Sequence, residues 1–169
     1  MYKRIVYILA VMIVITGCSS TRININSFDE CIAAGFPVME SYPRQCNDGQ
    51  NSYTEYIGNE LDKLDLIQID YPRPNAIISS PLNITGQAVG YWYFEADFPV
   101  ELYDAGGNLL GQGIATAQSD WMTEDFVPFE VILDFEKPED KYGLLILRKD
   151  NPSGDPRFND SLEVPVIFE

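Results

Sequence analysis

The residue types that perform most enzymatic chemistry are scarce in this chain. Its 169 residues include no histidine, so the usual general base and the commonest metal ligand are missing. The sequence also has no Gly-x-Ser-x-Gly motif and no glycine-rich phosphate loop. Carboxylates are abundant, but Glu95, Asp97 and Glu101 alternate with apolar residues and should lie on the solvent face of a strand. We therefore expect no catalytic residues, no cofactor and no bound metal.

The first of the three cysteines stands in a setting suited to covalent modification. Two cations precede an apolar run over residues 5–16, which has the size of an export signal and is short of the roughly 20 residues of a spanning helix. The run ends at a small residue, and Ile15-Thr16-Gly17-Cys18 resembles the cleavage box of bacterial lipoproteins. This resemblance implies a signal peptide, beginning with a signal helix, over residues 1–17 and acylation of Cys18.

Acylation would place the remainder of the chain outside the cytoplasm, held to a bacterial membrane by lipid. The serine after Cys18, rather than aspartate, resembles the outer-membrane sorting signal of Gram-negative bacteria. Residues 18–27 are polar enough to be a tether between the lipid and the folded part. The alternative is an uncleaved signal anchor in which Cys18 is an incidental thiol.

The other two cysteines, Cys31 and Cys46, are expected to form a disulfide, because an exported chain meets an oxidising compartment. The bridge would close a loop of about 15 residues and contribute roughly 3 kcal/mol in the chain-entropy model. Residues 28–59 are too few to bury much core, so this small module would depend on its disulfide. Within the module, a short helix should end at Gly35, and Asp48-Gly49 should form a tight turn before a short strand.

The spacing within this module resembles that of a small module near the N-terminus of many exported bacterial proteins, and the resemblance implies no activity. The segment Pro43-Arg44-Gln45-Cys46 is also similar to loops of small protease inhibitors, although such inhibitors usually contain six cysteines where this module has two. Inhibition through the Cys31–Cys46 loop, with Arg44 exposed, is therefore a weaker alternative to a structural cap or spacer.

The part of the chain that follows the signal is strongly acidic. Residues 18–169 contain 26 acidic and 9 basic residues, a net charge of −17. The negative electrostatic potential of such a surface repels phosphate backbones, which argues against nucleic acid as a partner. It also disfavours peripheral contact with anionic lipids. Membrane attachment is therefore expected through the N-terminal lipid.

After a short charged linker at residues 60–65, apolar and polar residues alternate with a period of two, which is typical of strands with one buried face. Seven strand-like segments are separated by turn residues: 67–71, 82–88, 94–102, 108–117, 129–135, 143–149 and 162–168. Most of them alternate, whereas 143–149 is a continuous apolar run suited to a central strand. This number of short strands favours an all-β fold, a seven-stranded immunoglobulin-like antiparallel sandwich over residues 66–169. A different seven-stranded sandwich or a small barrel also fits the alternation.

Longer motifs sharpen this expectation. Five segments resemble the immunoglobulin-like domain of bacterial spore germination: Ile69–Gly86, Trp92–Asp104, Asp120–Thr123, Phe126–Phe129 and Lys149–Asp155. The resemblance covers roughly residues 67–168, and it implies the sandwich fold. Since this domain is an accessory module, the resemblance does not imply a particular ligand.

Two clusters are candidates for binding. The aromatic cluster Tyr91-Trp92-Tyr93 is suited to recognition, because aromatic faces stack on sugar rings and anchor protein partners. Packing in the core of a sandwich is nevertheless the favoured interpretation of Trp92 and Trp121. Oxygen-bearing side chains gather between Asp150 and Asp155, as in calcium sites, but without EF-hand spacing, so a structural turn is the simpler interpretation.

The favoured function is therefore a non-catalytic lipoprotein of the cell envelope that displays its sandwich for contact with a protein or a wall polymer. Carbohydrate or small-ligand binding through Tyr91, Trp92 and Tyr93 is the main alternative.

Overall fold

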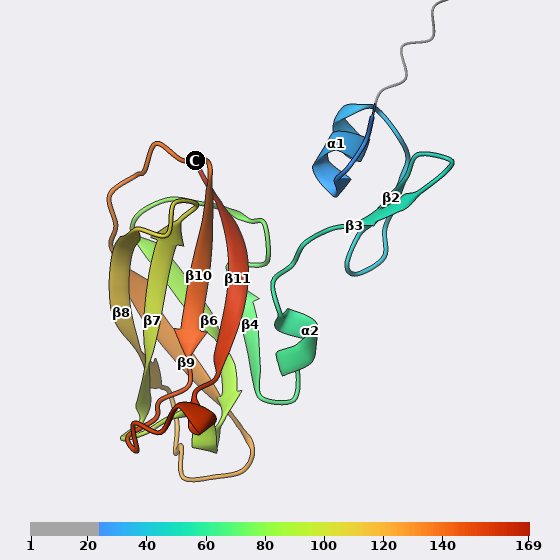
Figure 1. The fold of residues 1–169 in the computed structure, drawn as a ribbon. Helices are drawn as coiled ribbons and strands as arrows, with labels where there is room; N and C mark the ends of the chain where they lie inside the picture. The colour runs from blue at the N-terminus through green and yellow to red at the C-terminus, as the bar shows by residue number, and fades with distance from the viewer. Residues whose placement is uncertain (1–23) are drawn as a thin grey trace, which may run out of the picture.

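The computed structural model describes residues 24–169, which form a small disulfide-linked module followed by a β-sandwich (Figure 1). The predicted signal peptide with its helix, the lipidation site Cys18 and most of the predicted tether lie outside the described residues. Over residues 24–169, no helix has both the length and the apolar character that crossing a membrane requires.

The small module packs a short helix against a three-stranded antiparallel sheet with the order β1-β2-β3. Ser27 caps the helix by accepting a hydrogen bond from the backbone N–H of Glu30, and Gly35 follows the helix end with a φ of 84°. The predicted disulfide between Cys31 and Cys46 is confirmed and joins the helix to the central strand. The elements are α1 (Phe28–Ala33), β1 (Val38–Met39), β2 (Gln45–Asn47) and β3 (Ser52–Thr54).

The sandwich that follows is mostly β-structure, as predicted. Its strands are β4 (Ile67–Tyr71), β5 (Ile77–Ile78), β6 (Leu82–Val89), β7 (Asp97–Asp104), β8 (Leu109–Ala117), β9 (Phe126–Leu133), β10 (Tyr142–Arg148) and β11 (Ser161–Phe168). They form one curled sheet in the order β4-β6-β9-β8-β7-β10-β11-β5. β7, β10 and β11 lie in front of β6 and β9 (Figure 1), and β8 joins the two layers by pairing with both β7 and β9.

The sheet has eight strands where the alternation predicts seven. The additional strand, β5, has two residues and pairs in parallel with the end of β11, and a period of two cannot be recognised over two residues. β7 begins at Asp97 rather than at residue 94, because Glu95 and Ala96 form a turn with φ angles of 54° and 70°. β9 begins at Phe126, earlier than predicted, and ends before Phe135.

The core lies between the two layers and is built from alternate residues of each strand. Phe98 makes edge-to-face contacts with Tyr93 and Phe129, with ring centroids 5.2 and 5.0 Å apart. In β9 the alternation is confirmed, because Phe129 is buried while Ile132 is exposed. The buried side chains of β9 are Val127, Phe129, Val131 and Leu133.

Candidate functional site

The predicted aromatic recognition surface is not present as a cluster. Tyr91, Trp92 and Tyr93 lie on and just after the short 3-10 helix η1 (Gly90–Trp92), which turns these side chains in different directions. Trp92 is 0% exposed and Tyr93 is 3% exposed, whereas Tyr91 is 53% exposed. The Tyr93 hydroxyl donates to the backbone carbonyl of Val127 at 2.6 Å, which fixes the ring in the core. Trp92 and Tyr93, two of the three possible ligand contacts, are therefore core residues, and only Tyr91 is exposed.

Local packing explains why this turn points inward. A Cβ at Gly90 would lie 2.0 Å from the carbonyl oxygen of Thr123, so the turn is pressed against the segment before β9. Trp121 in that segment is partly buried against the main core. The remaining exposed ring, Tyr91, is covered by the ammonium of Lys149 at 5.5 Å from its centroid. Trp92 and Trp121 thus contribute to packing, and Tyr91 is the one ring of the three at residues 91–93 that faces solvent.

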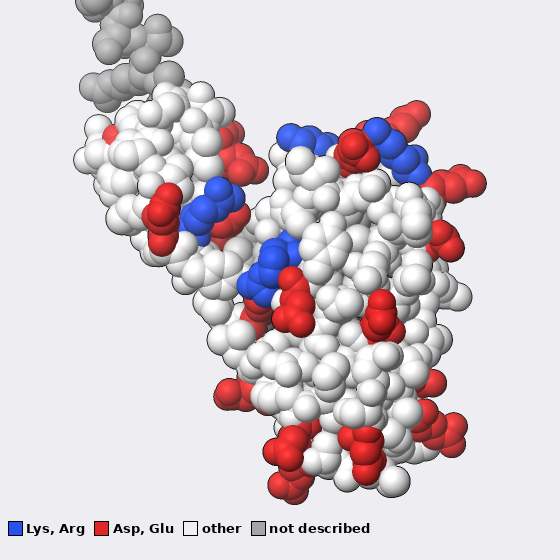
Figure 2. Space-filling model, turned by 180° about the vertical axis from the view of Figure 1, so that it is seen from behind, with Lys and Arg blue, Asp and Glu red and all other residues white. Residues whose placement is uncertain are grey.

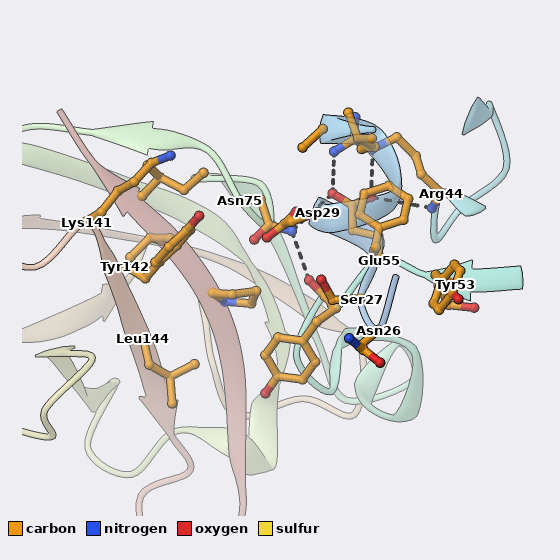
Figure 3. A pocket seen from close by; sticks show the side chains of 18 of the residues that line it. Asn26, Ser27, Asp29, Arg44, Tyr53, Glu55, Asn75, Lys141, Tyr142 and Leu144 are labelled. Atoms are coloured by element: carbon orange, nitrogen blue, oxygen red, sulfur yellow. Dashed lines mark hydrogen bonds and ion pairs between the residues drawn. The ribbon is translucent and has the colours of Figure 1, made fainter. Parts of the chain in front are cut away.

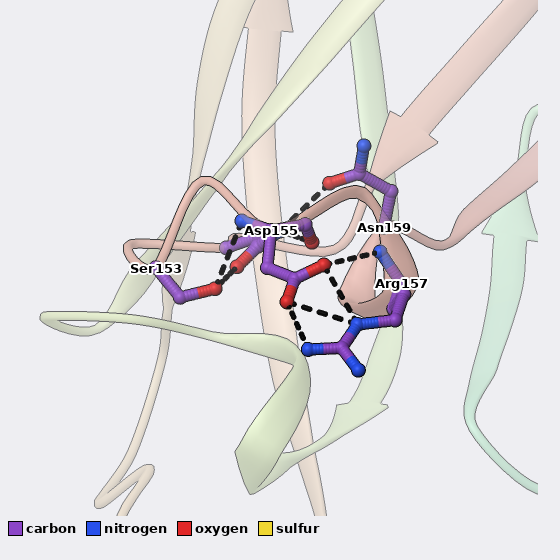
Figure 4. Close-up of polar contacts among 5 residues, drawn as sticks. Ser153, Asp155, Arg157 and Asn159 are labelled. Atoms are coloured by element: carbon purple, nitrogen blue, oxygen red, sulfur yellow. Dashed lines mark hydrogen bonds and ion pairs between the residues drawn. The ribbon is translucent and has the colours of Figure 1, made fainter.

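The acidic loop after β10 satisfies its own polar groups. Asp155 accepts hydrogen bonds from the backbone and the guanidinium of Arg157 (Figure 4), with 2.5 Å from its Oδ2 to the nearest guanidinium nitrogen. These hydrogen bonds hold the pKa of the Asp155 carboxyl below its usual range. Asn151 donates to Asn159 and to the Asp155 carbonyl. The loop thus forms a structural turn around η2 (Pro156–Phe158), which is the interpretation that the sequence favours over a calcium site.

Arg44, the residue considered for protease inhibition, forms part of the module's internal structure. Its guanidinium donates to both carboxylate oxygens of Glu55 at 2.8 and 2.5 Å, and it lies 5.4 Å from the centroid of the Phe28 ring. Glu55 is buried, and the hydrogen bonds from Arg44 lower the pKa of its carboxyl. The Arg44 side chain is 49% exposed, but its guanidinium is engaged in this bidentate ion pair.

Two buried glutamates attach the module to the sandwich. Glu55 also accepts a hydrogen bond from the side chain of Asn75 at 3.1 Å, and Asn75 donates to the carbonyl of Tyr56 at 2.9 Å. Glu60, the first residue of α2 (Glu60–Lys63) within the predicted linker, is 2% exposed and pairs with Arg73 at 2.7 Å. The segment before β4 and the segment after β4 are therefore held together by one ion pair and by hydrogen bonds from Asn75.

The second of these contacts includes a tyrosine from the module. The hydroxyl of Tyr42 donates to the Glu60 carboxylate and accepts from the Arg73 guanidinium at 2.9 Å. Burial, and then the hydrogen bond to Glu60, raises the pKa of Tyr42 to about 12 from its ordinary value of 10.0. Ionising this phenol would place a second negative charge beside Glu60.

A pH dependence follows from Tyr42. Because its pKa is raised in the folded state, its contribution to stability is present below pH 10.0 and is lost as the pH rises through about 12. We expect urea unfolding of the wild type to show falling stability across this window, and Tyr42→Phe to show a smaller fall. An identical fall in the variant would show that other tyrosines or lysines cause it.

The outer edge of β11 is also covered by segments next to β4. The side chain of Asn59 donates to the Ser161 carbonyl at 2.9 Å and accepts from the Glu163 amide at 2.7 Å, as a neighbouring strand would. The Asn75 amide donates to the carbonyl of Pro165 at 2.7 Å, and Pro165 itself has no N–H that needs a partner. The part of the β11 edge that does not pair with β5 is thus protected from pairing with strands of other molecules.

A cleft of about 1080 Å³ lies where the module meets the outer face of β10 and β11 (Figure 3). Lys141, Tyr142 and Leu144 line it from the sandwich, and residues of α1 and β3 line it from the module. Its volume slightly exceeds the roughly 300–1,000 Å³ that is typical of ligand pockets.

Charge is distributed unevenly around this junction. Figure 2 shows basic side chains beside acidic ones where the module meets the sandwich, and only acidic side chains at the far end of the sandwich on that face. Three described cations form no ion pair: Lys137, Lys141 and Lys149. Within residues 24–169, no three His, Cys, Asp or Glu side chains gather as they would to hold a metal ion.

Comparison with known proteins gives one match. The family model of the immunoglobulin-like domain of bacterial spore germination matches residues 66–155, which is more than half of the chain. The matched stretch runs from just before β4 to the loop after β10. No curated protein and no solved structure matches the chain.

Proposed function

Because this chain belongs to the family of immunoglobulin-like domains of bacterial spore germination, we propose that it is a non-catalytic lipoprotein of the bacterial cell envelope that binds another envelope protein. The family is a non-enzymatic one and suggests protein interaction. The observation that carries the proposal is the attachment of the small module to the sandwich through buried Glu55 and Glu60. A module fixed in this way creates a composite surface with a cleft, which is what a binding protein needs.

A protein is favoured over a wall polymer as the partner. Glycan recognition commonly relies on exposed aromatic rings, and only Tyr91 of the three candidates is exposed. The acidic surface, with a formal charge of −15 for the whole chain, would also repel anionic polymers and would favour a neutral or basic protein surface.

Attachment to the membrane through Cys18 is the second part of the proposal. Its support is the sequence before the described residues, with two cations, an apolar run and a small residue before the cysteine. We expect Cys18→Ala to abolish incorporation of a labelled fatty acid and to leave the protein with an uncleaved signal. Cys31 and Cys46 are paired with each other, so label that persists in this variant would contradict acylation at Cys18.

The proposed protein partner can be tested in intact cells. A photo-crosslinking amino acid placed at exposed positions on several faces of the full-length chain should yield a discrete protein adduct from at least one position. Adducts with glycan alone, or no adduct from any face, would contradict a protein partner.

A further inference from the structure

The exposed edge of β3 has backbone groups without partners. The Asp48 amide donates to the Asn51 carbonyl, and the Glu55 amide donates to the Arg44 carbonyl, so residues 51, 53 and 55 face β2. By the alternation of an antiparallel pair, Ser52 and Thr54 direct their N–H and C=O groups away from β2. No hydrogen bond among residues 24–169 satisfies the amides of these two residues.

This open edge faces the cleft. The backbone C=O group of Tyr56 points away from β2, as those of residues 52 and 54 do. It accepts a hydrogen bond from the side chain of Asn75 in the sandwich. Ser52 and Thr54 both line the cleft, and both are exposed. The contrast with β11 is informative, because Asn59 and Asn75 cover the edge of that strand while nothing in the described chain covers β3.

The other walls of the cleft expose mostly apolar surface, together with the charged side chains of Asp29 and Arg44. α1 contributes Ile32, which is 38% exposed, and β10 contributes Tyr142 and Leu144. Lys141 lies 5.2 Å from the centroid of the Tyr142 ring, so that its charge remains close to an aromatic face. An unpaired strand edge beside apolar side chains is the arrangement that strand addition uses: the backbone supplies hydrogen bonds, and alternate side chains of the peptide are buried.

We propose that this cleft binds an extended peptide segment of the partner protein, which adds to β3 as a fourth strand of the sheet β1-β2-β3. This inference rests on the proposed function as a protein-binding module and names the site and the chemistry of the partner. The segment has apolar residues at every second position, which would pack against the apolar side chains beside β3.

The test begins with a phage-displayed library of random 12-residue peptides, selected on the full-length chain in detergent. The best enriched peptide is synthesised twice, once unmodified and once with N-methyl groups on alternate residues, which removes strand hydrogen bonds but keeps the side chains. We expect N-methylation to weaken binding about tenfold or more, because two or more hydrogen bonds are lost. We also expect amide hydrogen exchange at Ser52 and Thr54 to slow when the unmodified peptide is added.

Variants then locate the site. Thr54→Pro removes one edge N–H at a position where proline is tolerated, and Leu144→Lys alters the opposite wall without touching β3. Both should weaken binding about tenfold, whereas Ile132→Lys on β9, outside the cleft, should leave it unchanged. Equal binding of the N-methylated peptide, or equal binding by Leu144→Lys, would overturn the proposal, and so would a selection that enriches no peptide.

Failure of this inference can be distinguished from failure of the proposed function. If photo-crosslinkers at Tyr142 give no protein adduct in cells while those at Ile132 do, the chain binds a protein elsewhere and the cleft inference falls alone. If no position gives an adduct, the proposed function falls. Self-association of the wild type that Thr54→Pro abolishes would identify a second copy of the chain as the occupant and would also overturn the inference.

Discussion

Replacing Trp92 by alanine is expected to lower the free energy of unfolding of the sandwich by about 3–5 kcal/mol. The Trp92 side chain is 0% exposed and belongs to the main core, so its removal leaves a large cavity among side chains that are held by the two layers. A loss of this size is a large part of the stability of a small domain. Urea unfolding followed by tyrosine fluorescence or circular dichroism measures the effect.

Tyr91→Ala is the matched control, because Tyr91 is adjacent in sequence and about half exposed. It should change stability by no more than about 0.5 kcal/mol. Trp92→Phe should be milder than Trp92→Ala, because the indole N–H has no hydrogen-bond partner among the described residues and the phenyl ring refills part of the space. If Trp92→Ala leaves the free energy of unfolding unchanged but weakens the binding of a ligand, Trp92 is a recognition residue.

Removing the disulfide is expected to unfold the small module while the sandwich remains folded. The bridge closes a loop between residues 15 apart in sequence, and the chain-entropy model gives it roughly 3 kcal/mol. The module has little else to hold it, since its core contains four buried residues: Ile25, Phe28, Cys31 and Cys46. In a variant with Cys31→Ser and Cys46→Ser, amide resonances of residues 28–56 should lose their dispersion while those of β6 to β11 keep it.

A reducing agent provides the control for this experiment. It should produce the same change in the wild type and no change in the double variant. If the amide resonances of the module keep their dispersion in the double variant, the contacts with the sandwich through Glu55 and Glu60 are sufficient to hold the module folded.

Periodicity accounts for most of the sandwich. Seven of its eight strands could be predicted from the sequence. Most follow from the alternation of apolar and polar residues, because one face of each strand packs in the core, and β10 follows from a continuous apolar run. β5 is missed since two residues contain no period, and the turn at Glu95 and Ala96 is missed because left-handed conformations at non-glycine residues have no reliable sequence signal. The disulfide could be predicted from the number of cysteines together with the expectation that the chain is exported.

The cleft could not be predicted in the same way. Its walls come from α1, β3, β10 and β11, which are far apart in the sequence, and only the docking of the module brings them together. That docking depends on Glu55 and Glu60, and the latter stands in a charged segment typical of a solvated linker. A buried glutamate is recognisable only once its partners, here Arg73 and Tyr42, are known to be near.

The fixed position of the module relative to the sandwich is the premise of both the composite surface and the cleft. Residual dipolar couplings of backbone amides over residues 24–169 measure it most directly. A single alignment tensor should fit the couplings of α1, β2 and β3 together with those of β6 to β11. Two tensors of clearly different magnitude would show that the module moves independently, and would contradict a preformed cleft.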